Sequence, residues 1–204
     1  MKSSIAEIPT ILGTAMGGGF YAGRIRIGDQ VFALIVAPKA DGEHEDAPWN
    51  DTYNAVDGAK SYFDGIANTD AMADAGSELA KWARGLRIGG HDDWYLPSQD
   101  ELEIIYRNLK PTMEVNWCYA RSGINLSAVE PTRPYTPDFP VQTLAEAFQK
   151  GGEQAFDPSY YWNSTQLASD SDCAWVQVFY YGGQGINRKH DYYRARAVRR
   201  LVIL

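Results

Sequence analysis

The sequence has few cysteines, no long apolar run and no excess of positive charge. Its two cysteines, Cys118 and Cys173, are far apart and lie outside any CxxC motif, so they cannot build a disulfide scaffold or, alone, a zinc site. We expect both to be small buried residues, with a single bridge as the alternative. The longest apolar run, residues 32–37, is far shorter than the roughly 20 residues of a membrane helix, so we expect no membrane insertion.

The N-terminal segment lacks the apolar core of a secretory signal. It starts with a basic residue, Lys2, but Glu7 and Pro9 interrupt the stretch that follows. Residues 1–19 end in three glycines, which predicts a flexible arm. We therefore expect synthesis in the cytoplasm without a signal peptide.

Charge and composition favour a folded protein that does not bind nucleic acid. The 204 residues carry 19 Lys and Arg against 26 Asp and Glu, a net charge of −7, and 45% are hydrophobic. This is enough apolar material for one domain with a core, and the acidic balance argues against a nucleic-acid surface. The 13 tyrosines, six tryptophans and 19 glycines are typical of recognition surfaces, and also of loop-rich cores.

Apolar spacing predicts both helices and strands. Ser98 and Glu101 form a capping box at the start of a helix that Pro111 ends. The other expected elements are a hairpin of 20–27 and 31–37, helices over 51–63 and 69–86, and strands beginning at 161, at 174 and at 195. Residues 112–158 contain several prolines and few apolar residues, so we interpret them as an insertion with one short helix over 141–150.

An acidic segment and a basic C-terminal end are expected to pair. Residues 40–80 carry ten acidic side chains and one lysine. The basic residues of the C-terminal end are Arg194, Arg196, Arg199 and Arg200. We expect these arginines to form ion pairs with the acidic segment rather than to bind nucleic acid.

Several short sequences, in this order, identify a family. They are 93–98 (DWYLPS) leading into Glu101 and Leu102, 161–166 (YWNSTQ), Ala174 and Trp175, Phe179, Gly182, Lys189 and 194–200 (RARAVRR). The chain resembles the C-terminal domain of bacterial collagen-like adhesins, the Lcl C-terminal-like family. It resembles in particular the variable receptor-binding proteins of phages that carry diversity-generating retroelements. The resemblance implies an α+β, C-type-lectin-like fold: helices packed on a small, twisted, mostly antiparallel sheet, loop-rich, with the insertion at 112–158 inside a domain of 20–204.

The resemblance also implies a binding surface near the C-terminus. Trp162, Arg196 and Arg199 match the frame of the family, and the residues between frame positions have no evident packing task. The expected receptor-contacting residues are Asn163, Leu167, Ser169, Asp170, Asp172, Gln177, Tyr180, Tyr181, Gln184, Asn187, His190, Asp191 and Tyr192. The alternative is that these are ordinary loop residues. Asn163 stands where many relatives have serine.

The expected function is that of a phage virion receptor-binding protein, at a tail-fibre tip or in another adhesin. Its partner would be a bacterial cell-surface protein or glycan. The N-terminal arm would attach it to other virion or tail proteins, and a homotrimer is expected by analogy with phage fibres. The alternative is a structural virion or surface assembly protein with a lectin-like fold and no receptor.

We expect no catalytic residue, metal or cofactor. His44, His91 and His190 share no motif with a nucleophile. Trp49-Asn50-Asp51 is similar to an element of calcium-dependent lectins, but Glu130-Pro131, the partial match to their loop, follows it instead of preceding it. We expect Asn50 or Asp51 to cap the following helix instead. Formylglycine-generating enzymes of the same fold superfamily use two cysteines, which makes Cys118 and Cys173 the basis of a weaker alternative.

Overall fold

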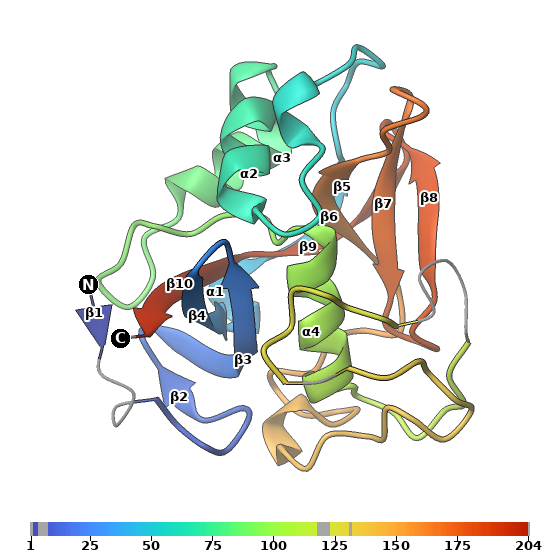
Figure 1. Ribbon diagram of the computed structural model, residues 1–204. Coiled ribbons are helices and arrows are strands. Elements are labelled where there is room, and N and C mark those ends of the chain that lie inside the picture. The colour runs from blue at the N-terminus through green and yellow to red at the C-terminus, as the bar shows by residue number, and fades with distance from the viewer. Residues whose placement is uncertain (1, 4–7, 118–122, 131, 204) are drawn as a thin grey trace.

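The computed structural model describes residues 2–3, 8–117, 123–130 and 132–203, which form a mixed α+β structure with two sheets (Figure 1). Both sheets are mostly antiparallel. In spatial order, the first sheet contains β1 (Lys2–Ser3), β10 (Val198–Ile203), β4 (Gln30–Val36), β3 (Gly19–Ile27) and β2 (Ala15–Met16). The second contains β5 (Glu43–Pro48), β9 (Tyr192–Arg196), β6 (Tyr160–Gln166), β7 (Cys173–Val178) and β8 (Gln184–Arg188).

The helices of the described residues cover these sheets. They are α1 (Lys39–Gly42), α2 (Gly65–Asp74), α3 (Glu78–Gly85) and α4 (Gln99–Leu109), with short 3-10 turns η2 (Asp57–Ala59) and η3 (Glu146–Phe148). Figure 1 shows α4 between the two sheets and α2 with α3 at one end of the molecule. No helix in this part of the chain is long and apolar enough to span a membrane.

The predicted hairpin is confirmed as β3 and β4, but the last predicted strand is two strands. The chain leaves β9 at Arg196, passes Ala197 and enters β10 at Val198, so it crosses from the second sheet to the first. In the first sheet β10 pairs antiparallel with β4 and parallel with β1. The two ends of the chain therefore lie side by side.

The predicted capping box at α4 is confirmed. The Ser98 hydroxyl accepts from the Glu101 backbone N–H at 3.4 Å, and the Glu101 carboxylate accepts from the Ser98 N–H at 2.7 Å. Leu102, Ile105 and Leu109 of this helix are buried in the main core. Because that core also takes side chains from both sheets, α4 holds the sheets together.

Two predicted helices differ from the structure. Residues 51–63 form no α-helix, only η2, and neither Asn50 nor Asp51 caps one. Two side chains from the second sheet bind this backbone instead. Gln166, at the end of β6, accepts from the Val56 N–H, and Lys189, just after β8, donates to the Asn54 carbonyl. Residues 69–86 are divided between α2 and α3 because Gly76 has a positive φ of 96° and ends the first helix.

The segment 112–158 lies against the core of the same domain. Where it is described, its one helical element is η3, so the helix expected over 141–150 is wrong. Tyr135, Phe148 and Phe156 are buried in the main core. The buried Glu103 carboxylate of α4 accepts from the Tyr135 hydroxyl at 2.7 Å, which anchors the segment.

Residues 8–19 are docked rather than free, contrary to the flexible arm that the glycines predict. Ile8 is buried against Tyr21, and the Gly13 N–H donates to the Tyr21 carbonyl at 2.8 Å. The Gly17 carbonyl accepts from Arg199 at 2.9 Å. Residues 1 and 4–7 of the expected arm lie outside the described residues.

Candidate functional site

A buried frame of tryptophans and arginines supports the C-terminal strands. The Trp162 indole N–H donates to the Ala47 carbonyl at 3.0 Å, and the Trp49 indole N–H donates to the Asn163 carbonyl at 2.8 Å. Both rings are fully buried. These bonds fix β6 against β5 and the residues that follow it.

The predicted ion pairs between the C-terminal arginines and the acidic segment are present, with one exception. Arg194 lies 3.1 Å from Glu43, and Arg200 lies 3.1 Å from Asp64. Arg199 pairs instead with Asp93, outside the acidic segment, at 2.7 Å. These arginines are held in the structure and are not a free basic surface.

Arg196 is the most deeply buried of the four C-terminal arginines. Its guanidinium donates to the Ala37 carbonyl and to both the backbone and side-chain oxygens of Gln154, at 2.7–3.0 Å. It also lies over the Phe156 ring, 4.7 Å from the centroid. Burial lowers the pKa of Arg196 to about 10 and raises the pKa of the neighbouring Glu43 carboxyl.

The thirteen expected contact residues fall into three exposure classes. Six are exposed: Ser169, Asp170, Asp172, Tyr180, His190 and Tyr192. Four are half-buried: Leu167, Tyr181, Asn187 and Asp191. Three are buried, contrary to the expected exposure: Asn163, Gln177 and Gln184.

The buried residues have structural bonds or packing. The Asn163 side chain accepts from the Thr165 N–H at 2.9 Å, and the Gln177 side chain donates to the Gly182 carbonyl at 2.8 Å. Gln184 is opposite Gln177 in the β7–β8 ladder. The alternation of apolar and polar residues along the strands does not reveal that these three side chains are buried, because α4 and the segment 112–158, distant in the sequence, cover one end of the sheet.

The exposed residues form two groups rather than one surface. Residues 167–172 connect β6 to β7, whereas residues 179–183 connect β7 to β8, so the two turns lie at opposite ends of β7 (Figure 1). His190 belongs with the first group, because the Lys189 N–H donates to the Asp172 carbonyl at 2.9 Å. Tyr180 and Tyr181 belong to the second.

The first group is polar and lies beside Tyr53. The Tyr53 hydroxyl forms a hydrogen bond with the His190 ring. The two rings also pack edge to face, with 4.9 Å between their centroids. Cys173 is half-buried rather than buried as expected, and its thiol points to Asp170 at 3.6 Å. Burial and this carboxylate raise the pKa of the Cys173 thiol. Cys118 lies outside the described residues.

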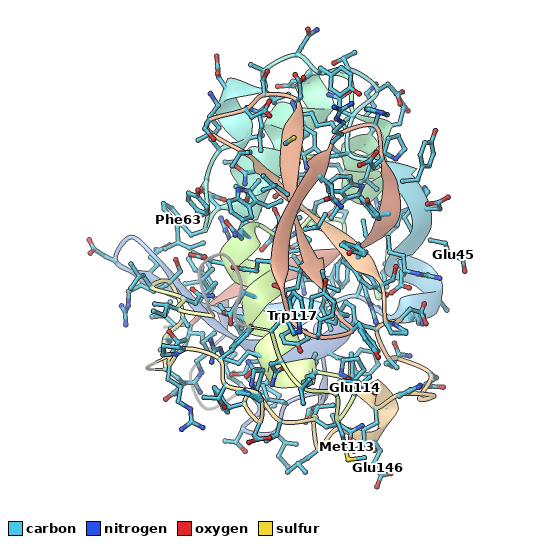
Figure 2. The ribbon with its side chains drawn as sticks, turned by 90° about the vertical axis from the view of Figure 1, so that its right-hand side faces the viewer. Glu45, Phe63, Met113, Glu114, Trp117 and Glu146 are labelled. Carbon is cyan, nitrogen blue, oxygen red and sulfur yellow. The ribbon has the colours of Figure 1, made fainter. Side chains whose placement is uncertain are left out.

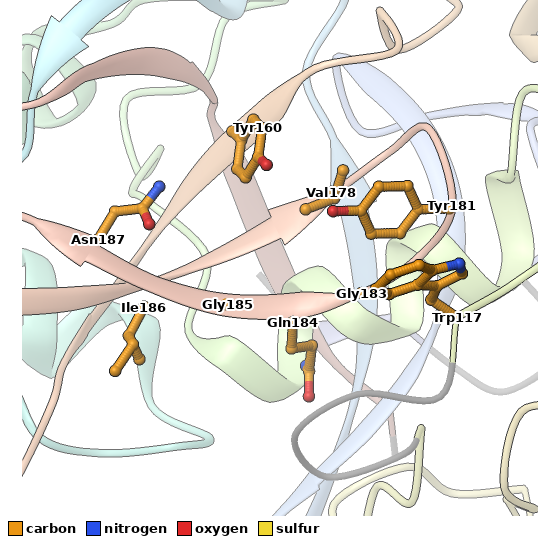
Figure 3. A pocket seen from close by; sticks show the side chains of 9 residues that line it. All are labelled: Trp117, Tyr160, Val178, Tyr181, Gly183, Gln184, Gly185, Ile186 and Asn187. Atoms are coloured by element: carbon orange, nitrogen blue, oxygen red, sulfur yellow. The ribbon is translucent and has the colours of Figure 1, made fainter.

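Tyr181 of the second group lines a pocket of about 280 Å³ at the edge of the second sheet, which we call the edge groove (Figure 3). It is lined by Trp117, Tyr160, Val178, Tyr181, Gly183, Gln184, Gly185, Ile186 and Asn187. Figure 3 shows Gln184 and Ile186 on one side of β8, and Tyr160, Val178 and Asn187 on the other. Gln184, which is opposite Gln177 in the ladder and 3% exposed, therefore lies on the buried face of the sheet, and the open side of the edge groove is that of Tyr160, Val178 and Asn187.

An aromatic pair forms one end of the edge groove. The Trp117 and Tyr181 rings lie 5.3 Å apart between centroids at 38°, and the Trp117 N–H donates to the Tyr181 carbonyl at 2.8 Å. Burial and a bond with Tyr160 raise the pKa of the Tyr181 hydroxyl. The lining contains no acidic or basic side chain, so its polar groups are neutral hydroxyls, carboxamides and backbone groups.

Sequence reasoning missed Trp117, the most exposed ring of the edge groove. Its side chain is 61% exposed and comes from the segment interpreted as an insertion. Figure 2 shows it below the second sheet, with Met113 further toward the base and Phe63 well away from it. A signal was present: Met113, Val115 and Trp117 alternate along the chain and are all exposed.

Nothing in the described residues is arranged as a metal centre. No group of three or more His, Cys, Asp or Glu side chains there is placed to hold a metal ion. His44 packs its ring edge-on against Trp82, far along the chain from His190.

The comparisons with known proteins identify a family and show a weak structural likeness. No curated protein matches the chain. A fimbrial protein from Bacteroides ovatus is similar in structure at a TM-score of 0.39 and 12% identity, over 82% of this chain and 35% of that one. The model of the Lcl C-terminal domain matches residues 44–199, and the chain belongs to this family.

Proposed function

We propose that this Lcl C-terminal domain is a non-enzymatic binding module of a phage virion, at a tail-fibre tip or in another adhesin. Its partner is a protein or glycan on the bacterial cell surface. The edge groove and the exposed tyrosines around it make the contact. The proposal includes a link to the phage proteins that retroelements diversify. It also includes a C-type-lectin-like fold, which the pairing of β1 with β10 at the two chain ends supports.

One observation carries the proposal: exposed aromatic rings gather beside the edge groove, on the same sheet as the buried Trp162 and Arg196. Trp117 and Tyr180 are 61% and 46% exposed, and Tyr181 lies between them, 5.3 Å and 6.0 Å away between centroids. Large rings that are exposed together provide contact area at a small cost in conformational entropy. Such clusters are characteristic of binding surfaces rather than of inert loops.

The test compares variants in adhesion to bacteria. The fluorescently labelled domain is first screened against a panel of bacterial isolates to find cells that bind it. Tyr180→Ala and Tyr181→Ala are then combined, and we expect a loss of cell binding of at least about tenfold. The control combines Phe63→Ala with Leu126→Ala, two exposed apolar residues outside the edge groove. Unchanged binding of the folded double variant rejects the proposed surface.

A second candidate function is assembly with further copies or other virion proteins. Ile11, Val141 and Leu144 are 71%, 65% and 92% exposed and line a common pocket of about 410 Å³. Apolar side chains gathered in this way favour a protein contact. Light scattering with wild type and Leu144→Glu tests it: an oligomer, such as the expected trimer, that the variant dissociates supports assembly through this face.

A further inference from the structure

We infer that the open side of the edge groove binds an extended, proline-rich segment of a cell-surface protein, with a basic residue beside the prolines. This inference rests on the proposed function and specifies its partner as a protein. It is drawn from a row of aromatic rings, from the glycines beside them and from the charges around them.

Four aromatic residues form a row across the open side of the second sheet, which we call the aromatic row. At one end Trp117 lies 5.3 Å from Tyr181, and at the other Tyr160 lies 5.2 Å from Tyr193, measured between ring centroids. A hydrogen bond between the side chains of Tyr181 and Tyr160 joins the two pairs. Because Trp117 and Tyr160 are 61% and 38% exposed, a ligand can reach the row from solvent.

Glycines leave the floor beside the aromatic row free of side chains. Gly185 is two residues from Asn187 on β8, so a Cβ at this position would point to the open side. Among the described residues it would contact Val176 alone, at 3.5 Å, an ordinary van der Waals distance. At Gly183 the Tyr181 ring fills the corresponding space, 2.7 Å from a Cβ. A ligand can therefore approach the backbone of β8 closely.

A polyproline II helix matches such a surface. It has three residues per turn and a rise of about 3.1 Å per residue, so prolines recur on one side about every 9 Å. Its proline rings pack against aromatic rings, and its backbone carbonyls, which have no internal partner, accept from hydroxyl and indole donors. Each residue of the aromatic row combines a ring with such a donor. The ligand also loses little conformational entropy, because its backbone is already extended.

A β-strand added to the free edge of β8 fits this site less well. Such a strand needs backbone groups along the whole edge. Gln184, the first residue of β8, is 3% exposed, so its backbone is covered. At the other end of β8, the Arg188 carbonyl already accepts from the Asp191 N–H at 2.9 Å. A polyproline II segment lies on the rings and needs no backbone ladder with the sheet.

Acidic side chains adjoin both ends of the aromatic row. Glu114 is exposed and lies three residues before Trp117, below it in Figure 2. Asp191 lies two residues before Tyr193, and burial together with this carboxylate raises the pKa of the Tyr193 hydroxyl. The whole chain also carries a net charge of −7, so a partner with positive charge is attracted to it.

The basic residues that adjoin the row in the sequence do not cancel this charge. Arg194 follows Tyr193 but lies 3.1 Å from both Glu43 and Asp157, so its charge is already paired. Arg188 is next to Asn187 in β8, so its side chain is on the opposite side of the strand. An arginine or lysine beside the prolines is therefore attracted, whereas an acidic residue is repelled.

The experiment measures the binding of labelled peptides to the wild-type chain by fluorescence anisotropy. The test peptide is decaproline with an arginine at each end. A glycine–serine peptide of the same length with the same ends tests charge alone, and decaproline with aspartate ends tests the sign of the charge. We expect saturable binding of the arginine-ended decaproline, and dissociation constants at least about fivefold weaker for the other two peptides.

Single substitutions locate the binding site. Trp117→Ala and Tyr160→Ala each remove one ring of the aromatic row, and Gly185→Leu fills the floor while it keeps every ring. We expect each to weaken the binding of the arginine-ended decaproline by at least about fivefold. Phe63→Ala is the matched control, because it removes an exposed ring elsewhere and should leave binding unchanged. Circular dichroism shows that each variant is folded.

Each outcome has one meaning. Binding of the arginine-ended decaproline that depends on the aromatic row and on Gly185 supports the inference. Equal binding of either other peptide, or unchanged binding by the folded variants, overturns it. If no proline peptide binds but the domain still adheres to cells through Tyr180 and Tyr181, the proline-rich partner is wrong and the proposed function stands. If adhesion is also independent of these tyrosines, the proposed function fails.

Discussion

The ammonium group of Lys189 lies 4.7 Å from the centre of the Trp49 ring, inside the domain. It donates to the Asn54 carbonyl at 2.8 Å and to the Gln166 side chain at 2.7 Å. One side chain therefore connects the end of β6 to the loop that precedes η2. The same bonds explain why the residues after Trp49 form no α-helix.

The first prediction concerns pH. Burial lowers the pKa of Lys189 to about 8, so between about pH 8 and 10.5 the folded chain binds fewer protons at this group than the unfolded chain. This linkage makes the free energy of unfolding rise with pH. We expect the stability of wild type relative to Lys189→Met to increase by on the order of 1 kcal/mol between pH 7 and pH 10, measured by urea unfolding. A difference that is constant with pH would contradict the assigned burial of the amine.

The second prediction concerns Arg196. Arg196→Met removes the donors to Ala37 and Gln154 and one of the charges beside Glu43. We expect a loss of about 3 kcal/mol in the free energy of unfolding. Arg196→Lys should lose less, because it keeps the charge but not the forked geometry.

Arg188, an exposed arginine on β8, provides the control for that measurement. Arg188→Met should unfold at nearly the same urea concentration as wild type. If Arg196→Met behaves in the same way, the buried guanidinium does not hold the frame together.

The elements that the sequence predicts correctly depend on local or short-range signals. The β3–β4 hairpin follows from two apolar runs around a turn, and the cap of α4 follows from Ser98 and Glu101 three residues apart. The pairing of Arg194 with Glu43 follows from opposite charge alone. The hairpin and the cap do not depend on how distant segments are placed, whereas the ion pair joins residues 151 positions apart.

The errors arise where distant segments decide the outcome. The helical spacing in 51–63 cannot reveal that Gln166 and Lys189 bind its backbone. Trp117 joins the edge groove only because its backbone meets Tyr181. The thirteen expected contacts follow the order of the sequence, whereas the structure buries three of them and divides the exposed turn residues between the two ends of β7.

The third prediction concerns the anchor of the segment 112–158. The Glu103 carboxylate accepts from Tyr135, from Asn125 at 2.7 Å and from Arg107 at 3.0 Å. Glu103→Ala removes all three bonds, so we expect faster amide hydrogen exchange in residues 123–140, detected by mass spectrometry. Glu114→Ala, an exposed change in the same segment, should leave this exchange unchanged. Equal exchange in both variants would show that apolar packing alone holds the segment.

The last prediction separates frame positions from surface positions among the expected contacts. Asn163 is 1% exposed and Tyr180 is 46% exposed, although both belong to the expected receptor surface. Asn163→Ala leaves the Thr165 N–H without its acceptor in a buried site, which should cost about 1–3 kcal/mol in urea unfolding. Tyr180→Ala should change stability by no more than about 0.5 kcal/mol, because its ring is on the surface. If the two substitutions are equally harmless, the Asn163 carboxamide does not stabilise the frame.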